Sequence, residues 1–146
     1  MSESNEQYFF NFSFFKVDPK WRWMADLAKE ESAKEVENII GNSKIMFRSY
    51  SNLGLRDDTD FLFWFAAPTV EEIQAVIEKL YKTVFGKYII PSRTYLSCTR
   101  PSLYVKDQKA LGFITGDDPK KHVIVYPFTK TREWYLLPKE KRQEIM

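Results

Sequence analysis

The first hydrophobic pattern along the chain is a dense aromatic run near the amino terminus. Five of the eight residues from Tyr8 to Phe15 are Phe, which favours a strand. Asp18 and Pro19 then predict a helix start, with an N-cap residue followed by proline at the first helical position. The helix is expected to end at Gly41-Asn42. Apolar residues recur at helical spacing between these limits, at Met24, Leu27, Ala28, Val36, Ile39 and Ile40.

Two further strands are predicted around a polar turn. Apolar residues from Lys44 to Tyr50 indicate the second strand, and those from Asp60 to Ala66 indicate the third. The residues between them, Ser51 to Asp58, are rich in Asn, Gly and Asp, which favour turns. The spacing therefore predicts a pair of strands joined by an ordered loop.

A second helix is predicted from Pro68-Thr69 to a stop at Gly86. Thr69 and Glu72 have the spacing of a capping box. The expected buried stripe consists of Val70, Ile73, Ile77, Leu80, Tyr81 and Val84. A fourth strand, Arg93 to Thr99, follows between two prolines. The order strand, helix, strand, strand, helix, strand predicts an α+β fold of the ferredoxin-like type, an antiparallel sheet with helices on one face.

The predicted sheet is apolar on both faces. Every residue from Phe61 to Phe65 is apolar, and Phe9-Phe10 and Phe14-Phe15 place aromatic rings on both sides. An antiparallel sheet with helices on one face usually has polar residues on the other. We therefore expect a second sheet, from a partner subunit or from more of the same chain, to cover that face, as in one half of a dimeric α+β barrel. The alternative is a sheet that tolerates surface aromatics.

The character of the sequence changes after Arg100. The stretch 106–121 is polar and reads as a long loop, His122 to Tyr126 as a short strand, and Pro138 opens a helix that is still running at Met146. We interpret 1–105 as a ferredoxin-like N-terminal domain. Residues 106–146 would be the loop, strand and start of a second, truncated ferredoxin-like half, so the chain would be a piece of a larger fold.

Aromatic residues make up 16% of the chain, so an aromatic core or an aromatic binding site is expected. Trp21 and Trp23 lie two positions apart on the first expected helix and therefore point in different directions. We predict that one of them packs inward, while the other covers surface or contacts a partner.

Charge and cysteine content exclude several function classes. Lys plus Arg is 22 and Asp plus Glu is 20, a balance that provides no basic surface for nucleic acid or an anionic membrane. The single cysteine, Cys98, allows no intrachain disulfide and no zinc cluster. The polar amino terminus lacks a secretory signal, and no apolar run reaches the length of a membrane span. A cytoplasmic protein is expected.

Isolated reactive residues define no site by themselves. His122, the only histidine, could be a haem ligand or a general base, but a strand-entry residue is favoured because it has no partner in the sequence. Asp57, Asp58 and Asp60 could hold a divalent cation, but turn and strand-start roles are favoured. Cys98 has no neighbouring base that would make it a nucleophile.

The densest group of chemically useful residues lies between Tyr126 and Pro138. It combines a tyrosine at the end of an expected strand, the cations Lys130 and Arg132, and Trp134-Tyr135 directly before a helix. Such a group could bind a flat aromatic ligand that carries carboxylates. The cations would pair with the carboxylates, and the aromatic side chains would form the apolar walls of the pocket. On residue chemistry alone, a packed surface loop is an equal alternative.

This segment resembles the Tyr-Pro-x-x-Lys…Trp-Tyr-x-Leu-x-x-x-x-Arg stretch of the chlorite dismutase superfamily, which includes chlorite-degrading enzymes and coproheme decarboxylases. The segment 54–60, Gly-Leu-Arg-x-Asp-x-Asp, and the segment 80–88 also resemble family sequence. The matching positions of the main stretch are Tyr126, Pro127, Lys130, Trp134, Tyr135, Leu137 and Arg142.

The resemblance implies a subunit of two ferredoxin-like halves, a homo-oligomer that is a pentamer, and haem b or coproheme as cofactor. It implies a catalytic role for Tyr126, as the radical site near a reactive propionate. The cofactor-binding residues it implies are Tyr126, Phe128, Lys130, Trp134 and Tyr135. It implies no metal ligand within the chain, because the iron-binding histidine is expected just beyond Met146.

The activity implied first is peroxide-dependent decarboxylation of coproheme, by an enzyme of which this chain is the N-terminal portion; the 146-residue piece alone would be inactive. Two positions depart from the decarboxylase pattern. Phe128 replaces a methionine, and only Lys120 and Lys121 stand near the place of an arginine. A chlorite dismutase-like or general haem peroxidase activity is the alternative, and a haem-free binding or structural barrel is the alternative of another class.

Overall fold

The computed structural model describes residues 7–99 and 120–145. The chain divides into two compact units, Met1–Thr99 and Arg100–Met146, and each is described by itself. The predicted domain boundary at 105/106 and most of the predicted loop 106–121 lie outside the described residues.

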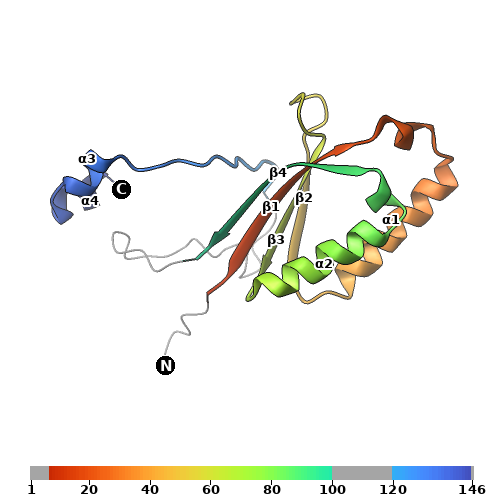
Figure 1. Cartoon of the computed structure of the whole chain (residues 1–146), viewed down its shortest axis with the longest axis horizontal. Helices are drawn as coiled ribbons and strands as arrows, with labels where there is room; N and C mark the ends of the chain where they lie inside the picture. Colours follow the sequence, from red (N-terminus) through yellow and green to blue (C-terminus); the bar gives the residue numbers. More distant parts are fainter. Residues whose placement is uncertain (1–6, 100–119, 146) are drawn as a thin grey trace. The chain divides into compact units, whose positions relative to one another are not determined.

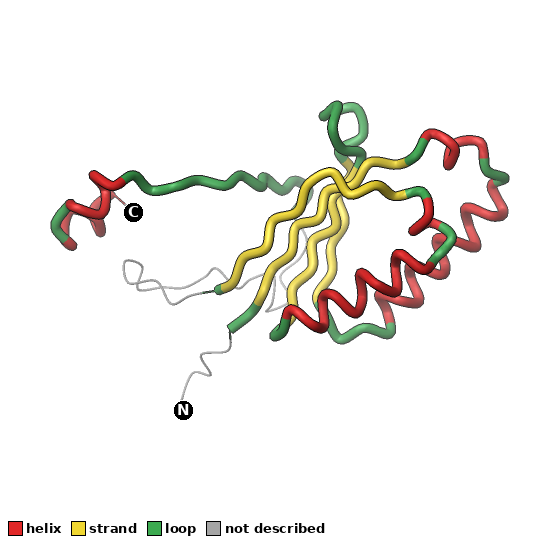
Figure 2. The backbone as a smooth tube through the Cα atoms, viewed as in Figure 1, coloured by secondary structure: helices red, strands yellow, loops and turns green. Residues whose placement is uncertain are grey.

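The first unit is built on one antiparallel sheet of four strands: β1 (Phe9–Val17), β2 (Met46–Ser51), β3 (Phe61–Ala67) and β4 (Ile89–Cys98). Their order across the sheet is β2-β3-β1-β4, and the strands lie side by side in Figure 2. Placing β1 between β3 and β4 is the split βαβ arrangement, so the predicted ferredoxin-like α+β fold is confirmed.

Two helices, α1 (Asp26–Gly41) and α2 (Val70–Lys82), lie against the same face of this sheet (Figure 1). Two short 3-10 helices, η1 (Pro19–Trp23) and η2 (Phe85–Lys87), flank them in sequence. Alternation along β3 directs Phe63 and Phe65 toward the helices. The buried core between sheet and helices consists of Phe15, Phe63, Phe65, Ala67, Ile73, Val76, Leu80 and Ile89.

The start of α2 follows the predicted capping box. The hydroxyl of Thr69 accepts a hydrogen bond from the Glu72 backbone N–H at 3.3 Å, and the Glu72 carboxylate accepts one from the Thr69 N–H at 3.2 Å. The predicted buried stripe is wrong at three positions. Val84 lies outside the helix, because α2 ends at Lys82 and not at the predicted Gly86. Tyr81 is 41% exposed, while Val76, which the prediction omitted, is buried. The buried positions Ile73, Val76 and Leu80 follow the i, i+3, i+7 spacing of one helical face.

The predicted first helix, from Pro19 to Gly41, is interrupted. Asp18 caps η1 through its side chain, which accepts from Lys20 N–H at 2.8 Å, but Met24 and Ala25 adopt extended backbone before α1 begins. The physical reason is the packing of Trp21, whose ring lies 5.1 Å from that of Phe85. Trp23 is 88% exposed, so the prediction that one tryptophan packs inward and one covers surface is confirmed.

Strand β4 begins earlier than predicted and contains Pro91 instead of being bracketed by it. Pro91 lies opposite Phe15 and Arg93 opposite Phe14, so Ser92 is an extra residue in the ladder. Such a bulge accommodates a residue without an N–H donor inside an antiparallel pair.

Aromatic rings occupy both faces of the sheet, as predicted. The face opposite the helices carries Trp64, whose ring stacks on Phe12 with 5.2 Å between centroids and an interplanar angle of 24°. On the same face Phe14 meets Tyr95 edge-on at 6.2 Å. These cross-strand pairs join β3 to β1 and β1 to β4.

The described part of the second unit contains α3 (Arg132–Leu136) and α4 (Lys139–Ile145). The predicted strand His122–Tyr126 does not form, and these residues have no regular secondary structure. A strand needs a hydrogen-bonded neighbour, and among the described residues this segment has no ladder partner. Within 7–99 and 120–145, no helix has the length and apolar character required to cross a membrane.

Candidate functional site

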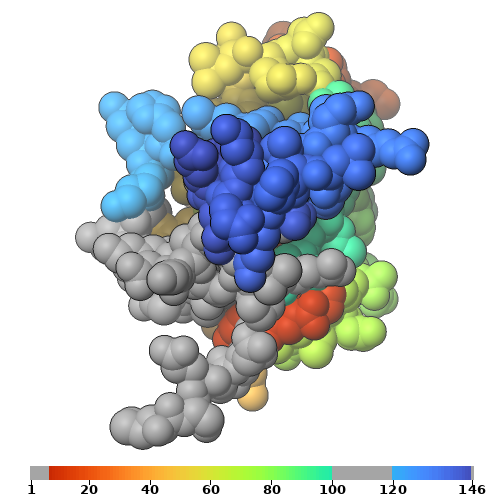
Figure 3. All heavy atoms as spheres, turned by 90° about the vertical axis from the view of Figure 1, so that its left-hand side faces the viewer, coloured from red at the N-terminus to blue at the C-terminus, as the bar shows by residue number. Residues whose placement is uncertain are grey.

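The segment from Tyr126 to Tyr135 presents large aromatic side chains to solvent. Tyr126 is 69% exposed, Phe128 71% and Tyr135 61%. The rings of Tyr126 and Phe128 lie 6.1 Å apart at 38°. The heavy atoms of these carboxy-terminal residues are drawn in blue in Figure 3. This arrangement leaves aromatic surface available to a ligand.

Trp134 is the centre of the contacts in this segment. The Nζ atom of Lys130 lies 3.8 Å from the centroid of the Trp134 ring, and the Cζ atom of Arg142 lies 5.5 Å from it. Tyr135 meets the same indole edge-on, with 5.1 Å between centroids and 89° between planes. A cation over an indole face is stabilised by about 0.5–1 kcal/mol at exposed sites.

The position of Trp134 depends on the start of α3. Thr131 is the N-cap, and its hydroxyl accepts a hydrogen bond from the Trp134 backbone N–H at 3.4 Å. The pKa of Glu133 is lowered, chiefly because its carboxylate accepts a hydrogen bond from its own backbone N–H and further because it accepts one from Thr131. Both effects favour an ionised carboxylate in the first turn of the helix.

The structure brings the predicted site residues into two groups. Tyr126 lies beside Phe128, and Lys130 and Tyr135 lie against Trp134. The prediction did not include Arg142 among the site residues, although the Trp-Tyr…Arg spacing pointed to it. The roles of all these residues remain predictions.

The donor set fits a flat aromatic cofactor that carries carboxylates. Lys130 supplies positive charge, and Trp134, Tyr126 and Phe128 supply aromatic surface. Among residues 7–99 and 120–145 there is no group of three His, Cys, Asp or Glu side chains that could hold a metal ion. The residues present can therefore bind the edge and face of such a cofactor.

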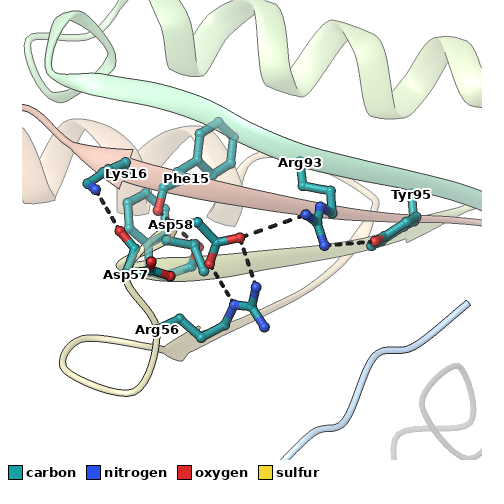
Figure 4. A network of polar contacts seen from close by, with 9 residues as sticks. Phe15, Lys16, Arg56, Asp57, Asp58, Arg93 and Tyr95 are labelled. Atoms are coloured by element: carbon teal, nitrogen blue, oxygen red, sulfur yellow. Dashed lines mark hydrogen bonds and ion pairs between the residues drawn. The ribbon is translucent and has the colours of Figure 1, made fainter.

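A second polar cluster lies at the β2–β3 hairpin in the first unit (Figure 4). Arg56 donates two hydrogen bonds to the Asp58 carboxylate, at 2.7 and 2.8 Å. Arg93 on β4 lies 3.8 Å from the same carboxylate and donates to the Tyr95 hydroxyl at 3.3 Å. Two arginines thus converge on one acid.

The neighbouring carboxylates serve the fold as well. Lys16 donates to the Asp57 backbone carbonyl at 2.6 Å, and Asp60 accepts the Val17 backbone N–H at 2.7 Å. The Arg56 hydrogen bond, followed by its charge, lowers the pKa of Asp58. These contacts tie the hairpin to β1 and β4, which agrees with the favoured prediction that Asp57, Asp58 and Asp60 are turn and strand-start residues.

Two other sequence candidates gain no support from their surroundings. His122 is exposed on the irregular segment, and Cys98 is half-buried at the end of β4, opposite Phe9. Within the described residues neither belongs to a group of metal-binding side chains. The tryptophan-centred segment is therefore the strongest candidate site.

Comparison with known proteins places the chain among relatives of one kind. The sequence profile of a family described as chlorite dismutase matches residues 28–146. A coproheme decarboxylase from Mycolicibacterium smegmatis is 34% identical over 98 residues, which are 66% of this chain and 42% of that protein. The match thus covers less than half the length of this curated relative.

Solved structures share the fold. Chlorite dismutase from Candidatus Nitrospira defluvii in complex with imidazole superposes with a TM-score of 0.75 at 21% identity, over 94% of this chain and 61% of that one. A variant of the same enzyme in complex with cyanide gives a TM-score of 0.74 at 21% identity, over 94% and 60%. Identity at this level supports the fold alone, whereas the family profile covers most of the chain. The chain belongs to the chlorite dismutase family.

Proposed function

We propose that this chain is the N-terminal portion of a haem-dependent oxidoreductase that decarboxylates coproheme with peroxide. The observation that carries the proposal is the cation-bearing aromatic cluster around Trp134, whose chemistry matches a flat ring with carboxylate arms. The coproheme decarboxylase that is 34% identical over 98 residues supports the choice of substrate.

Each residue of the segment has a proposed role. Lys130 would pair with a propionate carboxylate, since an ammonium with three donors forms strong charge-assisted hydrogen bonds. Trp134 and Tyr135 would wall the ring, and Phe128 would contact its apolar surface. Tyr126, 69% exposed, would present its phenol to a reactive propionate.

The proposed reaction requires a side chain that can exchange a hydrogen atom, such as a tyrosine, and not a general base. Removal of carbon dioxide from a propionate arm, with loss of one hydrogen, leaves a vinyl group, while peroxide and one proton become two waters. The bound iron supplies the oxidising power. After loss of one electron and its phenolic proton, Tyr126 could take a hydrogen atom from the propionate at its oxygen, and the second electron, released with carbon dioxide, would go to the peroxide-oxidised haem. Lys130 would hold the carboxylate beside Tyr126.

The proposed assembly is a homo-oligomer, a pentamer, located in the cytoplasm. The sheet supports a further covering layer, because Phe12, Phe14 and Trp64 form an aromatic surface on the face opposite α1 and α2. We propose that a second ferredoxin-like half covers this face. The iron ligand would follow Met146, and a histidine within the next helical turn of the gene product would support it.

The binding test is a titration of coproheme into the full-length gene product, followed by its Soret absorption. A shift at micromolar coproheme is expected. If the spectrum stays that of free coproheme, haem-dependent function is excluded, and a haem-free binding or structural barrel becomes the better description.

The catalytic test replaces Tyr126 by Phe. Coproheme binding should persist, while propionate loss after peroxide addition should stop. Tyr81→Phe, which changes a tyrosine on α2 in the other unit, is the matched control and should retain activity. Unchanged product formation in Tyr126→Phe would remove this residue from its proposed role.

Chlorite decomposition is the second candidate. The solved structures that share the fold are chlorite dismutases, and Phe128 departs from the decarboxylase pattern. Oxygen release on addition of chlorite to the haem-loaded protein, without propionate loss on peroxide addition, would favour this activity or a general haem peroxidase.

A further inference from the structure

Two cations approach one indole ring from different parts of the backbone. Lys130, in the irregular segment before α3, is 3.8 Å from the Trp134 centroid, and Arg142, in α4, is 5.5 Å from it. Trp134 itself belongs to α3. The ring therefore links three consecutive pieces of chain.

The two cations are suited to different tasks. A lysine carries a compact charge on a flexible four-carbon stem, whereas the planar guanidinium of arginine stacks on aromatic faces. Arg142 is also fixed by its helix, where its backbone N–H donates to the Pro138 carbonyl at 3.1 Å. Lys130 lies in a segment without regular secondary structure. Lys130 is thus the cation that can leave the ring, and Arg142 the one that stays.

The presence of two cations near one indole ring also favours the departure of Lys130 from it. Like charges near the same indole repel each other, and the repulsion grows as they approach. A ligand carboxylate beside Lys130 would replace a cation–π contact by a charge-assisted hydrogen bond. The indole would then lose its contact with Lys130 when it must form one side of the cofactor pocket.

We propose that Arg142 is a positioning residue: it holds the Trp134 indole from α4, so that Lys130 can move from the ring to a carboxylate of the cofactor without displacing the wall. The identity of the cofactor rests on the proposed function, whereas the contact by which Arg142 positions Trp134 does not. Arg142 would touch no cofactor atom. Its effect would reach the cofactor through the indole.

The first test uses the ligand-free chain. With 5-fluorotryptophan incorporated, the four tryptophans give separate ¹⁹F resonances, and Trp134→Phe identifies the one from Trp134. Arg142→Gln should shift that resonance, Arg142→Lys should shift it less, and Lys141→Gln, on the same helix, should leave it unchanged. An unmoved resonance in Arg142→Gln, with an unchanged far-UV spectrum, would overturn the proposal whatever the cofactor is.

The second test separates positioning from carboxylate binding. Coproheme and its tetramethyl ester, which has the same ring and no free carboxylate, are titrated into the full-length gene product. Lys130→Gln should weaken coproheme about tenfold or more and leave the ester unchanged, because only a carboxylate needs the ammonium. Arg142→Gln should weaken both ligands by about two- to fivefold, the size of one cation–π contact.

The outcomes are distinct. If Arg142→Gln weakens the binding of coproheme but not of its ester, Arg142 is a carboxylate ligand and its positioning role is overturned. Equal affinities of wild type and Arg142→Gln for both ligands would also overturn it. If wild type binds neither ligand, the proposed function fails, while the ¹⁹F result still decides whether Arg142 holds Trp134.

Discussion

The two units of this chain differ in how their aromatic residues are used. In the first unit, rings such as Phe63 and Phe65 are buried between sheet and helices, whereas none of the described residues 120–145 is buried. In the second unit, Trp134 is instead held by the Thr131 cap of α3 and by cations near its indole ring. Burial stabilises the first unit, and exposure leaves the second free to bind.

The largest expected effect tests this division directly. Phe65→Ala removes a fully buried ring and should destabilise the chain by about 3–5 kcal/mol. Phe128→Ala, which removes a ring that is 71% exposed, should change stability by less than about 0.5 kcal/mol. Urea unfolding followed by circular dichroism measures both. A similar loss in the two variants would contradict the comparison.

A smaller loss is expected where α2 meets η2. A Cβ atom at Gly86 would lie 2.7 Å from the Tyr81 Cα atom and closer still to the Leu80 carbonyl oxygen, both of which are backbone. Gly86→Ala should therefore destabilise by about 1–3 kcal/mol through overpacking. Gly41→Ala is the control, because nothing lies near a Cβ there. Equal melting temperatures of Gly86→Ala and wild type would disprove the close approach.

Two threonine caps sharpen the comparison between the units. Thr69→Ala removes the cap of a helix that buries three side chains, so unfolding should become easier by about 1 kcal/mol. Thr131→Ala removes the cap of α3, which buries none. Its melting temperature should stay the same, while the ¹⁹F resonance of Trp134 should move. A drop in melting temperature for Thr131→Ala would show that α3 contributes to the global fold.

The smallest effect is a pH dependence in the first unit. Because Arg56 lowers the pKa of Asp58, the folded state gains stability above the ordinary carboxyl pKa of about 3.9, and this gain disappears as pH falls through the lowered value. Asp58→Asn should therefore lower the melting temperature at pH 7, with a difference that shrinks toward pH 3. Arg56 is exposed and Asp58 is only half-buried, so added salt should shrink this difference as well. A difference independent of pH would assign the effect to the loop backbone.

Local sequence signals predicted most of the first unit. The Thr69–Glu72 capping box, the Asp18 cap and the unbroken apolar run from Phe61 to Phe65 each depend on residues within a few positions of one another. For this reason the helix α2, the four strands and the ferredoxin-like order could all be expected from the sequence.

The candidate site was predicted as a segment, but its internal geometry was not. The chemistry of Lys130 and Trp134 is visible in the sequence. The sequence did not predict that Lys130 contacts Trp134 or that Arg142 approaches the same ring from α4. Both contacts depend on the backbone conformation between the segments that carry these residues. The predicted strand at His122–Tyr126 failed because a strand depends on a neighbour that its own residues do not specify.

The sequence by itself determined the type and order of the elements, because hydrophobic period and caps act between near neighbours. Tertiary structure alone decided the interruption before α1, where Trp21 packs on Phe85, and the bulge at Pro91, which sets the register of β4 on β1. It also decided which cations share the Trp134 ring. The interruption, the bulge and the contacts of Trp134 each depend on residues that lie in different elements of the chain. Only packing in three dimensions brings those residues together.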